Sequence, residues 1–530
     1  MAVTHDASSS PLHVVVFPWL AFGHMIPFLE LSKRLARRGH AVTFVSTPRN
    51  AARLGAVPPE LSPRLRVATL DLPPVEGLPA GAESTADVPM DKVGLLKAAF
   101  DGLAAPFAAL VAGAGSEAPA NVFETKPDWI VLDFAQNWVL PIAEQHKVRV
   151  RQQATSDSLH VKNGQNLLYL NLNSIVSGDA FERKIPCAMF LILPAALLAY
   201  VGTRRDNEAR PRRTTEEFMA QPPWVPFPST LTYRRHEAEA IAAAFRPNAS
   251  GVADVDRLWQ LHHPSCRLVV HRSCPDAEPR LFPLLTSLFS KPVVPAGLLL
   301  PGAASAAADA DAGDGAFAAA ARWLDAQPRR SVVYVALGSE APVTAAHVRE
   351  LAAGLELSGA RFLWALRAPP PPSDHTVTAG GGGGEMLPGG FERRVAGRGV
   401  VVTGWVPQVR VLAHAAVGAF VTHCGWGSTA EGLFGFGHPL VMLPFVADQG
   451  LIARAMAARG VGVEVRREED DDAGGAFRGE DVAVAVRRVM EGEEGEEMAR
   501  RAREVKEVVG DRVRQEEYVD ELVEYLQRYK

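Results

Sequence analysis

The sequence predicts an α/β protein made of two doubly wound parallel-sheet domains. The chain has 530 residues, which is too long for one ordinary domain. Both halves open in the same way, with a short apolar strand, a loop and a helical pattern, at residues 13–38 and 331–357. A low-complexity stretch rich in Ala, Gly and Asp, residues 301–321, lies between the halves and is expected to be a linker.

The composition is that of a globular protein, with 47% hydrophobic and 22% charged residues. A net charge of −5 gives no reason to expect nucleic acid or an anionic membrane as a partner. The 4 cysteines are few and scattered, which fits a reducing compartment and no disulfide framework. His262, His263 and Cys266 lack a second ligand pair at suitable spacing, so no metal site is expected.

Targeting and membrane signals are weak. Residues 1–10 are polar and lack the pattern of a secretory signal, so a cytoplasmic location is expected. The longest apolar run, Ile185 to Val201, is interrupted by Pro186 and Pro194. We interpret it as a buried strand followed by the start of a helix, and we expect no membrane span.

The first half begins with a strand at 13–17, a helix at 24–38 and a strand at 41–46. This βαβ unit predicts a parallel sheet with a right-handed crossover. Further strands are predicted at 67–70, 128–133, 185–190, 268–270 and 293–295, with an amphipathic helix at 92–112.

Two polar residues follow predicted strands of this sheet. His24 lies just after the first strand, and Asp133 ends the strand at 128–133. Ligands of such sheets bind beyond the carboxyl ends of the strands, so both side chains are expected at the ligand edge. A hydroxyl nucleophile needs a base at neutral pH, and histidine, with an unperturbed pKa of about 6.5, suits that task.

Residues 149–184 do not fit the pattern of the first half. Residues 146–148 would run naturally into the strand at 185–190, but a polar segment with little periodicity intervenes. A long loop without secondary structure is unusual inside a compact domain. We interpret 149–184 as an insertion, such as untrimmed intervening sequence in the gene model; the alternative is a genuine additional element near the acceptor.

The second half centres on residues 405–450. The apolar run 419–422 predicts a buried strand, which a glycine-rich turn at 423–428 separates from a helix beginning at Thr429. Free backbone N–H groups and the helix dipole make such a turn an anion site, and a diphosphate fits it. Trp405 offers a flat face for a base, and Glu431 can accept hydrogen bonds from ribose hydroxyls.

This stretch resembles the donor-binding signature of plant family-1 UDP-glycosyltransferases. The residues that match are Trp405, Pro407, Gln408, His423, Cys424, Gly425, Trp426, Ser428, Glu431, Gly437, Pro439, Asp448 and Gln449. The resemblance implies the GT-B architecture, in which two Rossmann-like domains face each other across a cleft. The domains expected are 1–300 for the acceptor and 322–505 for the UDP-sugar, with the helix at 506–530 returning to the first domain.

The resemblance also assigns roles to residues. His24 matches the general base, and Asp133 matches the carboxylate that orients it. Trp426, Asp448 and Gln449 are expected to contact the hexose, and Gln449 mildly favours glucose. The donor-binding set implied by the resemblance is Ser339, Trp405, Val406, Gln408, His423, Trp426, Gly427, Ser428, Glu431, Asp448 and Gln449.

Two departures from the family pattern concern the donor turn. The family usually has Asn where this chain has Gly427, so one side-chain contact near the α-phosphate is missing. The segment from Glu431 to Gly437 is one residue longer than expected, with Gly435 as the extra residue. An added residue rotates the following side chains by about 100° unless a bulge absorbs it.

The activity expected from this resemblance is inverting transfer of a hexose, glucose first, from a UDP-sugar to a hydroxyl of a small molecule. The loop at 75–89 resembles the acceptor loop of enzymes that extend existing glycosides, which makes a glycoside the first-choice acceptor. A flavonoid or terpenoid aglycone, or an inactive UDP-sugar-binding homologue, are the alternatives. An NAD-dependent oxidoreductase is disfavoured because no G-x-G-x-x-G follows the first strand of either half.

The partners expected are the UDP-sugar, as co-substrate, and the acceptor, with no further cofactor and no metal. A monomer is the working expectation, although the sequence leaves the oligomeric state open.

Overall fold

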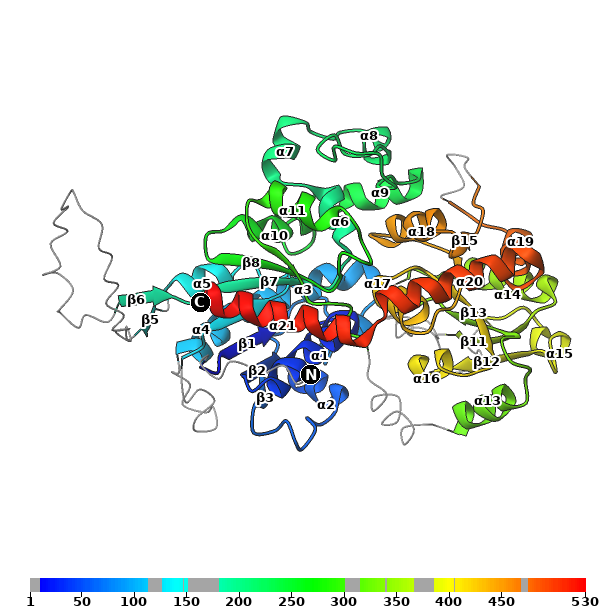
Figure 1. The fold of residues 1–530 in the computed structure, drawn as a ribbon, viewed down its shortest axis with the longest axis horizontal. Helices are drawn as coiled ribbons and strands as arrows, with labels where there is room; N and C mark the ends of the chain where they lie inside the picture. Colours follow the sequence, from blue (N-terminus) through cyan, green and yellow to red (C-terminus); the bar gives the residue numbers. More distant parts are fainter. Residues whose placement is uncertain are drawn as a thin grey trace, which may run out of the picture.

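The computed structural model of the chain describes residues 10–112, 126–145, 147–150, 181–300, 315–338, 341–366, 386–404, 406–468 and 475–530. Two parallel sheets, each covered by helices, form two domains that lie side by side (Figure 1). The predicted α/β class with two Rossmann-like domains is confirmed.

The first domain is built on a seven-stranded sheet with the order β3-β2-β1-β4-β7-β8-β9. Its central strands are short apolar runs that are buried on both faces, which is what a parallel sheet covered by helices requires. The strands are β1 (His13–Phe17), β2 (Ala41–Ser46), β3 (Leu65–Thr69), β4 (Trp129–Leu132), β7 (Cys187–Leu191), β8 (Cys266–His271) and β9 (Val293–Pro295).

The second domain has a six-stranded sheet with the order β12-β11-β10-β13-β14-β15, and its neighbouring strands pair in parallel. The strands are β10 (Val332–Ala336), β11 (Arg361–Leu366), β12 (Gly399–Thr403), β13 (Val417–Thr422), β14 (Leu440–Met442) and β15 (Gly462–Glu464).

Each sheet has one position where the strand order reverses. In the first sheet it lies between β1 and β4, which pair directly, and in the second between β10 and β13. The connections after the two strands leave in opposite directions at such a point, and a crevice opens beyond their carboxyl ends. His24 follows β1, Asp133 follows β4, and the donor turn follows β13. The fold therefore places the predicted site at the switch points of its two sheets.

Helices cover both sheets. Those of the first domain are α1 (Phe22–Arg37), α2 (Pro48–Leu54), α3 (Val93–Asp101), α4 (Ala104–Ala112), α5 (Val139–Gln145), α6 (Ala195–Val201), α7 (Arg204–Ala209), α8 (Thr215–Met219), α9 (Arg235–Ala243), α10 (Asp254–Trp259) and α11 (Leu281–Phe289), with short 3₁₀ helices η1 (Thr85–Asp87), η2 (Met90–Lys92) and η4 (Gln260–His262). Those of the second domain are α13 (Gly315–Asp325), α14 (Ala345–Ser358), α15 (Phe391–Arg394), α16 (Gln408–Leu412), α17 (Trp426–Thr429), the π-helix η5 (Ala430–Gly435), α18 (Gln449–Ala458), α19 (Gly479–Met490) and α20 (Gly492–Val509), followed by α21 (Arg512–Arg528).

The single helix predicted at 92–112 is two helices, α3 and α4, separated at Gly102 and Leu103. A Cβ atom on Gly102 would lie 2.5 Å from Cγ of Pro73. Close packing against this proline therefore requires a glycine at the break between the two helices. Among the described residues, Met90–Ala112 is the one stretch long and apolar enough to cross a membrane by length and composition, with a mean hydropathy of 1.6. Phe100 and Phe107 of this stretch are buried in the core of the first domain.

The ends of the expected insertion pair with each other. β5 (Lys147–Val150) and β6 (Phe181–Lys184) form a separate two-stranded antiparallel sheet, in which Lys147 is the partner of Lys184 (Figure 1). Residues 151–180 lie outside the described part of the chain. Because the two ends meet beside β7, the connection from α5 to β7 would close without the segment, and the insertion at 149–184 stays a prediction.

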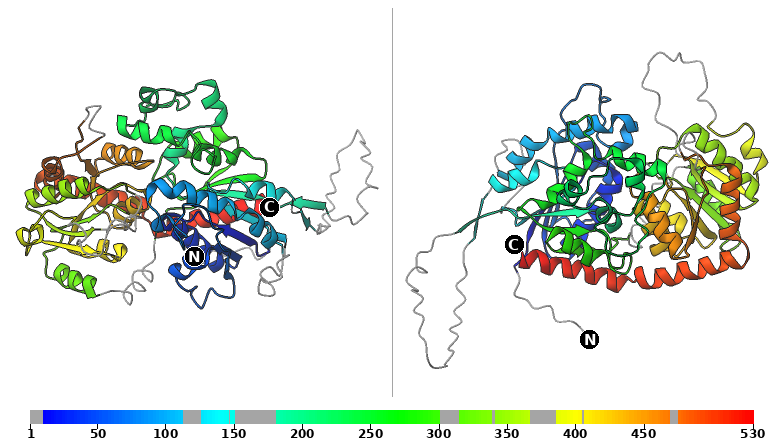
Figure 2. Two further views of the ribbon diagram at one scale, coloured as in Figure 1. Left: turned by 180° about the vertical axis from the view of Figure 1, so that it is seen from behind. Right: turned by 90° about the horizontal axis from the view of Figure 1, so that it is seen from above.

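The boundaries at both ends of the second domain differ from those predicted. Residues 315–321 are part of α13, and Phe317 and Ala320 are buried in the second core, so this domain begins before the predicted residue 322. At the other end α20 continues to Val509, which is buried in the same core. Figure 2 shows α20 and α21 running in line along one side of the molecule, from the second domain to the first.

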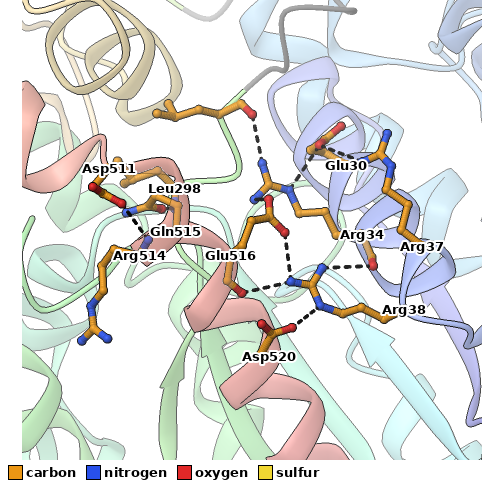
Figure 3. A network of polar contacts seen from close by, with 11 residues as sticks. Glu30, Arg34, Arg37, Arg38, Leu298, Asp511, Arg514, Gln515, Glu516 and Asp520 are labelled. Atoms are coloured by element: carbon orange, nitrogen blue, oxygen red, sulfur yellow. Dashed lines mark hydrogen bonds and ion pairs between the residues drawn. The ribbon is translucent and has the colours of Figure 1, made fainter. Parts of the chain in front are cut away.

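Helix α21 returns to the first domain, as the resemblance implies. Val519, Leu522 and Leu526 are buried against the first sheet, and the carbonyl of Leu526 accepts a hydrogen bond of 2.8 Å from Nε1 of Trp129. A polar network adds to this contact (Figure 3). In it, Arg34 of α1 and Arg38, which follows α1, form ion pairs with Glu516 at 2.8 and 2.9 Å, and Arg38 pairs with Asp520 at 2.6 Å.

Candidate active site

His24 and Asp133 meet at the switch point of the first sheet. His24 lies in the first turn of α1, and its Nδ1 is 2.7 Å from Oδ2 of Asp133. Both are buried, with 7% and 1% of their surface exposed. Because Nδ1 faces the carboxylate, Nε2 is the ring nitrogen that would take a proton from a substrate. The predicted pairing of these residues is present.

The carboxylate of Asp133 is held by the loops around it. Its Oδ2 also accepts a hydrogen bond of 3.0 Å from the backbone N–H of Trp19, and its Oδ1 accepts one of 2.7 Å from that of Phe134. The side chain of Gln136 ties the same loop to β1, because its Oε1 accepts from the Asp133 N–H and its Nε2 donates to the Phe17 carbonyl. These contacts fix the acceptor that orients His24.

His24 lines a cavity of about 500 Å³ between the two domains. The first domain contributes apolar and aromatic side chains to its wall, as well as part of the 75–89 loop that was expected at the acceptor. The residues that line it from this domain are Trp19, His24, Thr85, Ala86, Val88, Pro89, Met90, Val93, Lys97, Phe134 and Leu193. The second domain contributes Leu337, Gly338, Ala341, Pro342, Val343, Trp364, Ala365, Leu366, Met386, Val446, Ala447, Asp448 and Gln449.

The donor turn follows β13 as predicted, but the helix begins earlier. It starts at Trp426 rather than Thr429, so Gly427 and Ser428 lie in the first turn of α17. Cys424 has a φ of 65°, a left-handed conformation that is uncommon for a residue with a side chain. The turn therefore presents backbone N–H groups at the start of a helix, which is the geometry of an anion site.

The ring of His423 lies close to two glycines, Gly425 of this turn and Gly338 after β10. A Cβ atom on either Gly338 or Gly425 would lie 2.5 Å from its ring, so only glycine fits at both positions. Burial lowers the pKa of His423 to about 4. The imidazole is therefore neutral at neutral pH and can donate one N–H to an anion, without adding a positive charge.

The residues predicted for the nucleoside form a connected group. Nε2 of Gln408, at the start of α16, donates to Oε2 of Glu431 at 2.8 Å and lies 3.4 Å from Oγ of Ser428. Val406 packs half-buried against the second core. Ser339 and Trp405 lie outside the described residues, so their predicted contacts with the donor stay predictions.

The side chain of Trp426 is buried where the two domains meet. It is 3% exposed, its Nε1 donates to the carbonyl of Arg272 at 2.6 Å, and its ring packs against Phe434. The contact of Trp426 with the hexose stays a prediction. The indole joins the donor turn to the first domain, because Arg272 follows β8.

Asp448 and Gln449 line the same cavity as His24, and their contact with the sugar stays a prediction. Oε1 of Gln449 accepts from the backbone N–H groups of Phe445 and Val446 at 2.9 and 3.1 Å, so its amide NH₂ is the group available for a sugar hydroxyl. Tyr233 of the first domain donates its O–H to the carbonyl of Ala447 at 2.8 Å and so fixes the loop. Ala447 has a left-handed φ of 56°.

The extra residue between Glu431 and Gly437 is absorbed as a bulge of the kind predicted. Residues 430–435 form the π-helix η5, which accommodates more residues per turn than an α-helix. Gly437 then ends the helix with a left-handed φ of 73°, and its N–H donates to the carbonyl of Leu433 at 2.8 Å. The strand β14 and the loop carrying Asp448 and Gln449 consequently keep their places.

Two residues that we did not predict belong to this region. Lys97 lines the cavity, with its Nζ 2.5 Å from Oδ1 of Asp254 and 6.0 Å from the centre of the Phe134 ring. Its sequence signal is a lysine four residues before Asp101 in a mostly apolar helix. Arg272 contacts the donor turn, and its signal is a charged residue two positions after the predicted strand 268–270.

Comparison with known proteins gives one consistent group. A family model described as "UDP-glucoronosyl and UDP-glucosyl transferase" matches residues 301–504. The chain is 38% identical over 521 residues to UDP-glycosyltransferase 91C1 of Arabidopsis thaliana, covering 98% of each chain. It is 32% identical to soyasaponin III rhamnosyltransferase of Glycine max, covering 100% of this chain and 98% of that one.

The fold is similar to that of solved structures in the same group. Glycyrrhiza uralensis UGT73P12, complexed with glycyrrhetinic acid 3-O-monoglucuronide, gives a TM-score of 0.72 at 22% identity, covering 98% of this chain and 96% of that one. Arabidopsis thaliana UGT89C1, complexed with UDP-L-rhamnose, gives 0.64 at 22% identity, covering 98% and 100%. At this level of identity the likeness shows the fold.

Proposed function

This chain belongs to the plant family-1 UDP-glycosyltransferases, and we propose that it is an inverting O-glycosyltransferase that transfers glucose from UDP-glucose to a hydroxyl of a small-molecule glycoside. The observation that carries the proposal is the pairing of His24 with Asp133 at 2.7 Å, on the wall of a cavity that Asp448 and Gln449 line from the other domain. The proposed base and the proposed sugar-binding residues therefore line one cavity.

In the proposed reaction His24 removes the proton from an acceptor hydroxyl through Nε2. The hydroxyl oxygen attacks the anomeric carbon of the sugar from the face opposite UDP, and the bond from that carbon to the diphosphate oxygen breaks. An α-linked donor then gives a β-linked product. Asp133 holds the imidazole in the productive tautomer and stabilises the imidazolium that forms.

The leaving UDP gathers negative charge as this bond breaks. In the proposal the start of α17, with Ser428 and the N–H of Gly427, stabilises that charge through preorganised hydrogen bonds. His423 adds one N–H as a neutral donor. UDP-sugar is then the co-substrate, and the proposal includes no metal ion.

The choice of a glycoside as acceptor is supported by the name of one relative and by the cavity. Cyanidin 3-O-galactoside 2''-O-xylosyltransferase of Actinidia chinensis var. chinensis, at 32% identity, is named for an acceptor that is already a glycoside. The 85–89 segment, which we expected at a glycoside acceptor, lines the cavity beside His24. The names of the relatives include a xylosyl and a rhamnosyl transferase, so the donor sugar is the part of the proposal that needs a direct test.

A screen of donors against paired acceptors tests the proposal. UDP-glucose, UDP-xylose and UDP-rhamnose are each offered with flavonoid and terpenoid glycosides and with the aglycones of the same glycosides. We expect UDP-glucose with the glycosides to give the highest kcat/KM, and NMR of the product to show a β-linkage. Faster transfer to the aglycones would contradict the proposal that the acceptor is a glycoside. UDP binding without transfer to any acceptor would identify an inactive homologue.

A further inference from the structure

Arg272 of the first domain lies against the donor turn of the second. It directly follows β8, and its carbonyl accepts the hydrogen bond from the indole of Trp426 described above. The backbone of Arg272 is thus fixed to the first residue of α17. From there its side chain reaches the next residue of the turn, Gly427.

The side chain of Arg272 is buried, and only part of its hydrogen-bonding capacity is used. The residue is 5% exposed, and its Nε donates to the carbonyl of Leu298 at 2.9 Å. Among the described residues, no hydrogen bond or ion pair is found for the two terminal nitrogens. Burial lowers the pKa of Arg272 to about 10, with Glu431 as the main opposing charge, so the group remains cationic at neutral pH. The two terminal nitrogens are not among the fully buried atoms of the described residues that lack a partner, so they are accessible to an anion at this turn.

Gly427 leaves room for this cation. A Cβ atom on Gly427 would lie 3.3 Å from Nη1 of Arg272, so a side chain at 427 would project onto the guanidinium. At the donor turn, the guanidinium of Arg272 from the first domain therefore lies beside the position where Gly427 has no side chain. Ser428 and the backbone N–H groups of α17 lie on the same turn.

We propose that Arg272 is a diphosphate-binding residue that takes the position left by the missing side chain at Gly427. The inference rests on the proposed function, since it requires UDP at this turn. A planar guanidinium can give two parallel N–H hydrogen bonds to a phosphate, and such charge-assisted bonds are stronger than neutral ones. The same contact stabilises the charge that UDP gains as the bond to the sugar breaks.

The C-terminal helix holds this arginine in position. Oε1 of Gln515 in α21 accepts the N–H of Leu298 at 2.5 Å, and the carbonyl of Leu298 accepts from Nε of Arg272 (Figure 3 shows Gln515 and Leu298). Nε2 of Gln515 donates to the carbonyl of Val509 at 2.8 Å. The helix that crosses between the domains thereby contacts the chain segment that supports Arg272.

The test compares the affinities of Arg272→Met and Arg267→Met for UDP and for uridine, by calorimetry on the full-length protein. Arg267 lies at the opposite end of the same strand, where its Nη1 donates to the carbonyl of Tyr529 at 2.7 Å. For Arg272→Met we expect UDP affinity to fall about 10- to 100-fold, the range of a charge-assisted hydrogen bond, and uridine affinity to stay unchanged. Arg267→Met should bind both ligands like the wild type.

Uridine lacks phosphates, so it reports whether the nucleoside site is still folded. Arg272→Lys, which keeps the charge but loses the planar fork, should bind UDP with intermediate affinity. Unchanged UDP affinity in Arg272→Met, or equal losses for UDP and uridine, would overturn the role of Arg272 and leave the proposed function standing. A wild-type protein that binds neither UDP nor uridine would overturn the proposed function and this inference together.

Discussion

His24 lies in the first turn of α1 and Asp133 directly follows β4, yet one hydrogen bond of 2.7 Å joins these buried residues. Their closeness follows from the sheet, because β1 and β4 are neighbours and their carboxyl ends lie at the same edge. The carboxylate can perform two tasks there: it selects the tautomer of the imidazole, and it stabilises the imidazolium that forms during catalysis.

Asp133→Asn should lower kcat about 10²- to 10⁴-fold at saturating donor and acceptor, because an amide can hold the imidazole in the wrong tautomer and adds no negative charge. Steady-state kinetics with the preferred substrates measures the effect. Asp128→Asn is the matched control, since Asp128 precedes the same strand and contacts the His13 N–H and Lys530. A kcat within twofold of wild type in Asp133→Asn would contradict the role of this carboxylate.

The position of a single side chain was predictable from the sequence where it depends only on the strand that the residue follows. His24, Asp133, Ser428, Glu431 and Gln449 all lie where the pattern indicated. Contacts between the domains were not predictable in this way. The sequence shows that Trp426 follows a strand, but which way its indole points depends on how the domains pack, and the carbonyl that it reaches lies in the other domain. Arg272 was missed for the same reason.

At the scale of elements, the π-helix η5 shows how the chain absorbs an additional residue. Its two glycines face different surroundings. A Cβ atom on Gly435 would meet its nearest neighbour, the carbonyl oxygen of Ala430, at 3.6 Å, an ordinary contact. A Cβ atom on Gly432 would lie 2.5 Å from the ring of Phe420. The glycine at 435 is therefore dispensable, whereas the one at 432 is required by close packing on β13.

Gly435→Ala should raise the free energy of unfolding by about 0.5–1 kcal/mol, because alanine loses less backbone entropy in a helix. Gly432→Ala should lower it by about 1–3 kcal/mol through overpacking. Urea denaturation of the two variants measures the difference, and neither residue contacts the proposed substrate positions. Equal effects of the two substitutions would contradict the packing described for η5.

His438, just after η5, predicts a dependence of stability on pH. Burial lowers its pKa to about 4 in the folded protein, and its Nε2 donates to the carbonyl of Leu412 at 2.7 Å. The unfolded chain, with a pKa near 6.5, takes up the proton first as the pH falls. The contribution of this residue is therefore complete above pH 6.5 and is lost between pH 6.5 and 4, by at most about 1.4 kcal/mol per pH unit.

His438→Gln should reduce the slope of stability against pH between pH 6.5 and 4, and the slope that remains comes from other buried histidines such as His423. Urea midpoints at pH 7.0, 6.0 and 5.0 measure the slope. A slope for His438→Gln that equals the wild-type slope would show that His438 does not titrate in this window.

Boundaries of elements were the least predictable part of the fold. The helix predicted at 92–112 is broken because Gly102 packs on Pro73, which is distant in the sequence. Helix α13 begins inside the stretch whose composition predicted a linker, because Phe317 and Ala320 are buried in the second core. Composition and periodicity describe a segment alone, whereas these boundaries depend on contacts with other segments.

At the scale of the whole molecule, the switch points of the two sheets lie at a shared cavity, which is where the proposed substrates would meet. This arrangement was predictable, because the strand–loop–helix opening occurs in both halves. Helix α21 joins the domains: its apolar face is buried in the first, and Tyr518 is buried in the core of the second.

The apolar contacts of α21 should matter more to stability than its ion pairs. Leu522→Ala removes a side chain that is 1% exposed and should lower the free energy of unfolding by about 2–5 kcal/mol. Asp520→Asn removes a partly exposed ion pair with Arg38 and should cost less than about 1 kcal/mol. Urea unfolding followed by tryptophan fluorescence compares them. A larger loss of stability in Asp520→Asn than in Leu522→Ala would show that the ion pairs dominate this contact.

The central claim is that an imidazole of the first domain takes the proton of an acceptor hydroxyl, in front of a UDP-sugar held by the second. The most direct measurement is the rate of sugar transfer by His24→Ala, at saturating donor and acceptor, together with its affinity for UDP. We predict a loss of at least about 10²-fold in kcat, with UDP affinity unchanged. Wild-type kcat in His24→Ala would contradict the claim.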